Sequence, residues 1–192
     1  MNPIQNLLSH QPVIVIDGAL GTELERKGCD LNDALWSSKV LIDSPNIIKD
    51  IHLSYLEAGA DCITTSSYQS SIEGFVAHGF DAQTAYALIR KSSEIAVEAR
   101  DAFWSQLTED ERSHRQKPIV IASLGPYGAY LANGSEFRGD YPLDKQTMFN
   151  FYRPRIQALI EGGAEMLGCE TLPSSEEALL VIELLNTEFP HV

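Results

Sequence analysis

The chain has 192 residues, 44% of them hydrophobic and 21% charged, with a formal net charge of -13. This composition is typical of a globular domain with one sizeable core. The acidic excess argues against nucleic acid as a partner, because phosphate contacts need Lys and Arg. No run of about 18 apolar residues would span a membrane, and residues 1–11 lack the basic-then-apolar pattern of a leader. We therefore expect a cytoplasmic protein with no nucleic-acid or membrane partner.

The first predicted element is a strand at residues 12–16, a short apolar run rich in β-branched side chains. Asp17 follows this strand directly, so its carboxylate is expected at the carboxyl end of the strand. Gly18 and Gly21 come next and would allow a ligand to approach the backbone closely. Asp17 could equally be a helix N-cap or a turn residue.

A helix is predicted from Ser44-Pro45 to Gly59, with Ser as N-cap and Pro at the first helical position. The second strand is predicted at residues 60–65. Thr65 and Ser66 end it, and their hydroxyls could bind polar groups of a substrate or satisfy the backbone of the loop.

Asp81 is expected to cap a long helix that reaches about Leu107, whose apolar stripe indicates a packing face. Residues 108–117 are highly charged and predict a solvated link. The third strand is predicted at residues 118–122, and Ser123 follows it.

Residues 123–141 form a long segment in which Gly125, Gly128, Gly134 and Gly139 argue against a helix. A loop of this length in a compact domain is often functional. The segment is also rich in aromatic residues, and these could instead cover an edge of the core.

Asp144 is expected to cap the next helix, which Pro154 should kink or split. The fourth strand is predicted at residues 164–169 and is followed by Glu170. Ser174 then begins a helix to about residue 188, with Glu177 three residues on in the spacing of a capping box.

The alternation of strands and helices predicts parallel βαβ units. An internal echo supports this, because Glu-Ala-Gly-Ala-Asp at residues 57–61 and Glu-Gly-Gly-Ala-Glu at residues 161–165 both precede a strand. A doubly wound open sheet is possible, but polar residues beyond every strand favour a (β/α)8 TIM barrel. Such a barrel needs about 250 residues, so residues 1–192 are expected to form the N-terminal half of one barrel domain, about four βα units.

The motifs at residues 17–23, 64–68, 123–141 and 170–174 together resemble the homocysteine S-methyltransferase family, in order and in spacing. The similarity is greatest to the bacterial enzymes that use S-methylmethionine. The resemblance implies a zinc-dependent (β/α)8 barrel in which Asp17 lies near homocysteine and Glu170 binds its amino group. It also implies that Thr65, Ser66 and Ser123 line the same pocket.

The family's zinc is held by three cysteines in Gly-x-Asn-Cys-like and Gly-Gly-Cys-Cys motifs, and this sequence contains neither. The family pattern places both motifs beyond Val192. Cys29, Cys62 and Cys169 do not match them, so we expect no metal ligand and no catalytic residue within these 192 residues.

The implied reaction transfers a methyl group from S-methylmethionine, or S-adenosylmethionine, to the thiol of L-homocysteine, with a zinc thiolate as nucleophile. Tyr127 and Tyr130 could attract the sulfonium of the donor through cation–π contacts, or could serve packing alone. The alternative function is a non-catalytic half-barrel that folds or self-associates through its open edges, without activity because the zinc cysteines are absent.

Overall fold

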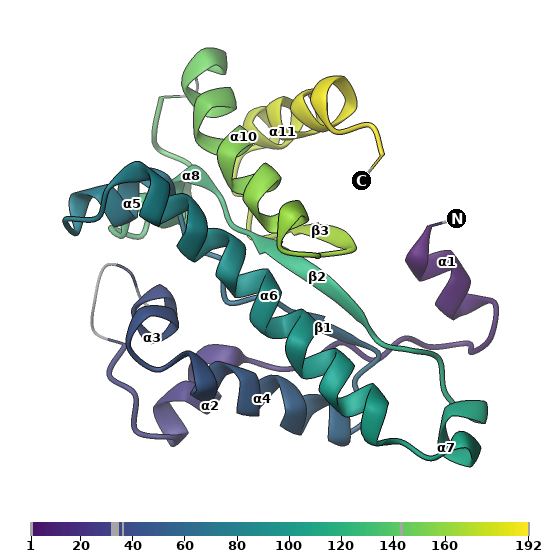
Figure 1. Cartoon of the computed structure of the whole chain (residues 1–192). Helices are drawn as coiled ribbons and strands as arrows, with labels where there is room; N and C mark the ends of the chain where they lie inside the picture. The colour runs from purple at the N-terminus through teal and green to yellow at the C-terminus, as the bar shows by residue number, and fades with distance from the viewer. Residues whose placement is uncertain (1, 32–34, 36, 143, 192) are drawn as a thin grey trace.

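The computed structural model describes residues 2–31, 35, 37–142 and 144–191. Its centre is a parallel sheet with the strand order β1-β2-β3 (Figure 1). The strands are β1 Cys62–Thr64, β2 Ile119–Leu124 and β3 Met166–Cys169. Thr64 pairs with Ile121, and Ile121 pairs with Met166, so the predicted second, third and fourth strands are confirmed as parallel neighbours.

The helices follow the predicted alternation with the strands. They are α1 Pro3–Leu8, α2 Leu20–Arg26, α3 Ser37–Asp43, α4 Pro45–Glu57, α5 Ile72–Ala77, α6 Ala82–Gln106, α7 Glu109–Ser113, α8 Tyr127–Leu131, α9 Ser135–Arg138, α10 Lys145–Glu161 and α11 Ser175–Glu188. Asp81 and Asp144 cap α6 and α10 as predicted, each accepting a backbone N–H three residues on. None of these helices is long and apolar enough to cross a membrane.

The predicted first strand is wrong in extent, because residues 12–16 make only one isolated bridge, between Ile16 and Cys62. The segment lies parallel to β1, and the Asp61 N–H donates to the carbonyl of Val15 at 2.7 Å. Its side chains are largely in water, with Val13 at 65% and Ile16 at 60% exposure. A β-branched run makes a regular strand only where neighbours pair with it, and β1 alone supplies few pairs.

One face of the sheet is covered by α4, α6 and α10, which lie side by side across it (Figure 1). The helical stripes predicted from the sequence supply this layer. Ile48 on α4, Ile89 on α6 and Ile156 on α10 are all completely buried. Burying each such side chain stabilises the fold by about 1.5–3 kcal/mol. Pro154 does not split α10, which is continuous around it.

Two acids, Asp61 and Glu165, hold the amino ends of the strands. They end the two similar motifs at residues 57–61 and 161–165. Asp61 Oδ2 accepts the N–H of Val15 at 2.9 Å, and Glu165 Oε2 accepts the N–H of Val120 at 2.8 Å. Each acid also donates its own N–H to the carbonyl of the same partner residue, at 2.7 and 2.9 Å. Both acids therefore join neighbouring strands in the same way.

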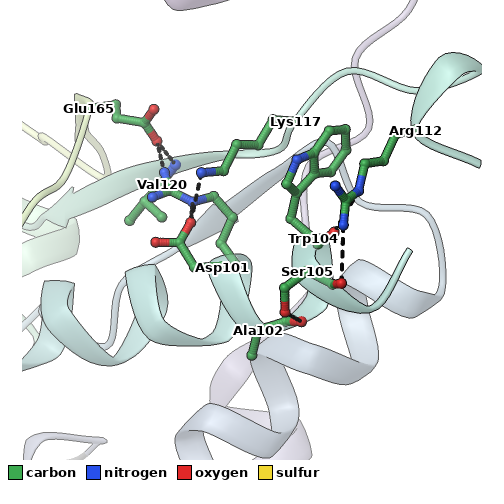
Figure 2. A network of polar contacts seen from close by, with 9 residues as sticks. Asp101, Ala102, Trp104, Ser105, Arg112, Lys117, Val120 and Glu165 are labelled. Carbon is green, nitrogen blue, oxygen red and sulfur yellow. Dashed lines mark hydrogen bonds and ion pairs between the residues drawn. The ribbon is translucent and has the colours of Figure 1, made fainter. Parts of the chain in front are cut away.

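Figure 2 shows the charges around the second of these joins. Arg100 donates to Glu165 and to Asp101, and Lys117 lies 2.8 Å from Asp101. The predicted solvated link includes the short helix α7, because Thr108 and Glu111 form a complete capping box. This charged cluster lies at the amino ends of the strands, whereas the predicted site residues lie at the carboxyl ends.

Candidate functional site

A cavity of about 370 Å³ opens at the carboxyl ends of the strands. Its wall is formed by residues 18–22 and 64–66 and by the ends of β2 and β3. Ser37, Tyr68 and Phe137 complete the wall. A concave site of this size takes a small molecule rather than a macromolecule.

Asp17 lies directly behind this wall. Its carboxylate accepts the backbone N–H of Thr64 at 2.8 Å and the Thr64 hydroxyl at 3.1 Å. Burial raises the pKa of Asp17 to about 6, the Thr64 hydrogen bonds oppose this rise, and the nearby Glu170 charge adds to it. The carboxylate is therefore ionised at neutral pH, but burial makes its ionised form less stable than it would be in water.

Gly18 lies against the end of a neighbouring side chain. A Cβ at this position would lie 2.8 Å from the hydroxyl oxygen of Tyr55, so any larger residue would have to displace the end of that ring. The close approach to the Gly18 backbone that the sequence predicts is thus made by a side chain of the protein, Tyr55. Gly18 also lines the cavity.

Glu170 lines the cavity and is exposed in it. The Ser123 hydroxyl donates to Glu170 Oε1 at 2.5 Å, which links the ends of β2 and β3. Charge-assisted hydrogen bonds of this kind are about twice as strong as neutral ones. The serine therefore holds the carboxylate in one orientation.

The hydroxyls of Thr65 and Ser67 form a closed ring with the backbone of Ser123. The Ser123 N–H donates to Thr65 Oγ1 at 3.0 Å, and the Ser67 hydroxyl donates to the Ser123 carbonyl at 2.7 Å. Thr65 must then donate to Ser67, 2.5 Å away, because the Ser67 proton is already used. The Thr65 hydroxyl is thus engaged in the wall, which agrees with the alternative that it satisfies the loop.

Two buried hydroxyls at the cavity have no hydrogen-bond partner among the described residues, those of Ser37 and Ser66. A buried polar group without a partner costs about 1–3 kcal/mol, and such groups mark places where water or a ligand binds. Ser66 was predicted from its place after the second strand. Ser37 was missed, because it lies on α3 and no motif of the sequence indicates it.

Thr171 was also missed. It lines the cavity beside Glu170 with a φ of 56°, in the left-handed region that β-branched residues avoid. Backbone strain of this kind is concentrated at functional sites. The motif at residues 170–174 includes Thr171, but nothing in the sequence indicates its conformation.

The aromatic segment packs mainly on itself. The ring of Tyr127 lies 5.4 Å from that of Tyr130, 5.7 Å from Tyr141 and 4.9 Å from Phe151. Neither Tyr127 nor Tyr130 is among the residues that line the cavity, so their expected contact with a sulfonium there is replaced by packing. Phe137 is the aromatic residue of this segment that lines the described cavity.

The buried carboxylate of Glu177 anchors this aromatic segment through hydrogen bonds. This carboxylate accepts the Tyr127 N–H at 2.8 Å and the hydroxyls of Tyr141 and Tyr152 at 2.5 and 2.8 Å. The predicted capping box is therefore only half formed: Ser174 accepts the Glu177 N–H, but the glutamate side chain turns to the tyrosines. The Glu177 side chain is fully buried, and three donors there take the place of the single N–H of Ser174.

Arg155 anchors the loops that follow β1 and β2. It is 1% exposed and donates to the carbonyls of Ser70, Gly125 and Tyr68 at 2.7, 3.1 and 3.1 Å. Sequence reasoning missed it, because an arginine on an amphipathic helix normally indicates a solvated face. Its guanidinium instead fixes the path of two loops that form the cavity wall.

The described part of the chain brings together no three His, Cys, Asp or Glu side chains that could hold a metal ion. The cysteines are far from forming such a set, since Cys29 packs near α2, Cys62 is buried and Cys169 is exposed. The residues present therefore do not fit a zinc centre.

The family model described as homocysteine S-methyltransferase matches residues 14–192. The chain is 55% identical to homocysteine S-methyltransferase YbgG of Bacillus subtilis, covering 99% of this chain and 59% of that protein. It is 47% identical to the selenocysteine methyltransferase of Astragalus bisulcatus, covering 91% of this chain and 54% of that protein.

Among solved structures, the metallated form of the homocysteine methyltransferase MmuM from Escherichia coli matches with a TM-score of 0.89 at 46% identity. That match covers 96% of this chain and 62% of the other. The chain thus spans about three fifths of the length of these relatives. Sequence and fold agree, and this chain belongs to the homocysteine S-methyltransferase family.

Proposed function

We propose that this chain forms the homocysteine-binding part of an enzyme that transfers a methyl group to the thiol of L-homocysteine, giving methionine. The methyl donor in this proposal is S-methylmethionine or S-adenosylmethionine. The observation that carries the proposal is the Glu170 carboxylate in the wall of one small cavity, together with the unpartnered hydroxyls of Ser37 and Ser66. The fold in this proposal is the N-terminal half of a (β/α)8 barrel, with residues 1–192 as part of one domain.

The carboxylates suit the ammonium group of an amino acid. Glu170 is held by Ser123 and faces the cavity, so it would accept the ammonium directly. Asp17 adds negative charge from behind the wall, and a bound ammonium would relieve the cost of its ionisation. Ser66 would donate to the polar end of the same substrate, which would satisfy its hydroxyl. Thr65 would act only through the position it gives to Ser123.

In the proposed reaction the sulfur of homocysteine attacks the methyl carbon of the donor in line. The new S–CH₃ bond forms as the bond to the sulfonium sulfur breaks, the donor leaves as a neutral thioether, and the thiol proton passes to solvent. The part of this chain in that reaction is to bind and orient the amino-acid end. Since the described residues do not fit a metal, we derive no step through zinc.

A second candidate is a half-barrel that binds no donor and pairs with another copy. The exposed edge segment favours it, because the apolar side chains of Val13, Val15 and Ile16 are 65%, 51% and 60% exposed. Sedimentation of the purified chain distinguishes the two, because the binding function needs no dimer.

The direct test is the affinity of homocysteine for the Glu170→Gln variant, measured by calorimetry. Glutamine keeps the size of the side chain but removes its charge, so we expect a loss of roughly 10- to 100-fold. Glu176→Gln is the matched control, since Glu176 is exposed at the start of α11 and does not line the cavity. Equal affinities in the wild-type and Glu170→Gln chains would contradict the assignment of the ammonium to Glu170.

A further inference from the structure

Phe137 occupies an unusual position for a phenylalanine. It is 76% exposed, the highest value among the large exposed apolar residues that the structure describes, and it lines the cavity. Burying such a ring would stabilise the fold by about 1.5–3 kcal/mol, so its exposure contributes nothing to folding. In the described cavity the ring is therefore open to a ligand.

The other rings of the aromatic segment have no free face of this kind. Tyr127 and Tyr130 pack in edge contacts with each other and with Phe151, at 5.4, 4.9 and 5.8 Å. Tyr68 lines the cavity, but its ring is packed against the backbone at Gly125, where an added Cβ would lie 2.7 Å from it. Phe137 is therefore the more exposed of the two aromatic rings in the described cavity wall.

The backbone holds Phe137 in place although its side chain is exposed. Its short helix α9 is bracketed by Gly134 and Gly139, with φ angles of 81° and 69° that favour glycine. An added Cβ at Gly128 would lie 2.6 Å from the Glu136 nitrogen, and one at Gly139 would lie 3.3 Å from Pro173. Close packing on both sides of α9 thus holds the backbone that carries Phe137 at the cavity.

We propose that Phe137 recognises the sulfonium of the methyl donor by a cation–π contact in the cavity. This inference rests on the proposed function, in which the donor is a sulfonium. The face of a phenylalanine ring attracts a cation within about 6 Å of its centre. The ring has no hydrogen-bonding atom, so it selects for positive charge and methyl groups without competing for the carboxylates.

The contact also distinguishes the donor from the product. Methyl transfer leaves a neutral thioether, which lacks the transferred methyl group and has no charge to attract to the ring. The cation–π attraction is present before transfer and weakens as the charge disappears, so it acts on donor binding rather than on the chemical step. We therefore expect Phe137 to set the KM for the donor and the ratio of donor to product affinity, with little effect on kcat.

The test compares the binding of S-methylmethionine and methionine to wild-type, Phe137→Leu and Phe137→Tyr chains by calorimetry. Leucine keeps the apolar contact but removes the ring face, so Phe137→Leu should weaken S-methylmethionine binding roughly 3- to 30-fold. Methionine binding should change less than about twofold, because a neutral thioether gains no cation–π attraction. Phe137→Tyr should keep the wild-type ratio. Leu179→Ala is the control, being 66% exposed on α11 and outside the cavity wall.

Equal losses for S-methylmethionine and methionine in Phe137→Leu would overturn the proposal, because the ring would then be only an apolar contact. No change for either ligand would overturn it too. A wild-type chain that binds homocysteine but neither S-methylmethionine nor S-adenosylmethionine would refute a sulfonium donor in this cavity, and the inference with it. A wild-type chain that binds none of the three would contradict the proposed function itself.

Discussion

Asp17 is a residue whose charge opposes folding. Its pKa is raised from 3.8 to about 6, mainly by burial. An acid with a raised pKa stabilises the folded state while it is protonated, and this contribution is lost as the pH rises from about 4 to about 6. At neutral pH the ionised carboxylate therefore lowers the free energy of unfolding, as is common for groups in functional sites.

Asp17→Asn should make the chain more stable at pH 8 and leave its stability unchanged near pH 4. Asparagine can still accept the Thr64 N–H, but it carries no charge to desolvate or to repel Glu170. The gain at pH 8 should be about 1–2 kcal/mol after allowance for partial exposure. Urea unfolding at both pH values measures it. A loss of stability at pH 8 would mean that the charge itself holds the Thr64 loop.

Residues that follow strands could be predicted to lie close together, because parallel strands end at one edge of a sheet. Ser66, Ser123 and Glu170 meet at the cavity for that reason. Ser37 and Phe137 could not be predicted, because they lie on helices whose position depends on tertiary packing. The role of Arg155 was hidden in the same way, since helical spacing gives the face but not the carbonyls that it meets.

At the scale of elements, long helices with regular stripes were predicted well, and α6 and α10 are confirmed nearly to their ends. The capping box of α11 was only half right, because tertiary donors attracted the Glu177 side chain. The loop prediction for residues 123–141 missed α8 and α9, which are short turns between glycines. The conformation of this segment depends on the buried carboxylate of Glu177, which accepts hydrogen bonds from Tyr127 and Tyr141.

Glu177→Gln should destabilise the chain by about 2–4 kcal/mol, because an amide cannot accept all three hydrogen bonds from a buried position. Tyr141→Phe and Tyr152→Phe each remove one donor and should each lose about 1 kcal/mol. Chemical unfolding measures all three variants. The ionisation of Tyr141 gives a second readout, because burial and the hydrogen bond to Glu177 raise its pKa. A Glu177→Gln variant as stable as wild type would show that the tyrosines pack without the carboxylate.

At the scale of the molecule, the order of strands and helices predicted a parallel sheet with helices packed on it, and this is confirmed. The first strand was wrong in extent because a strand is completed by its neighbours, and residues 12–16 pair only with β1. Sequence periodicity describes one segment at a time and contains no information on the number of neighbours. The pattern of exposed apolar side chains along this segment is what the structure adds.

The purified chain should bind well below one zinc ion per molecule. The described residues offer no three ligands in one place, and isolated cysteine thiols hold zinc weakly. Elemental analysis after dialysis against zinc measures the content, with Cys169→Ser as the control that should leave it unchanged. Tight stoichiometric zinc in the wild-type chain would contradict this ligand argument.

The contacts made by Asp61 and Glu165 have a consequence for how the sheet is assembled. Each acid follows a helix and directly precedes a strand. Through both its N–H and its carboxylate, Asp61 joins β1 to Val15, and Glu165 joins β3 to Val120. Residues 12–16 and β1, and likewise β2 and β3, are thus joined by the same pair of contacts. Because each pair of contacts is made by the residue directly before a strand, the register of that strand is set where the strand begins.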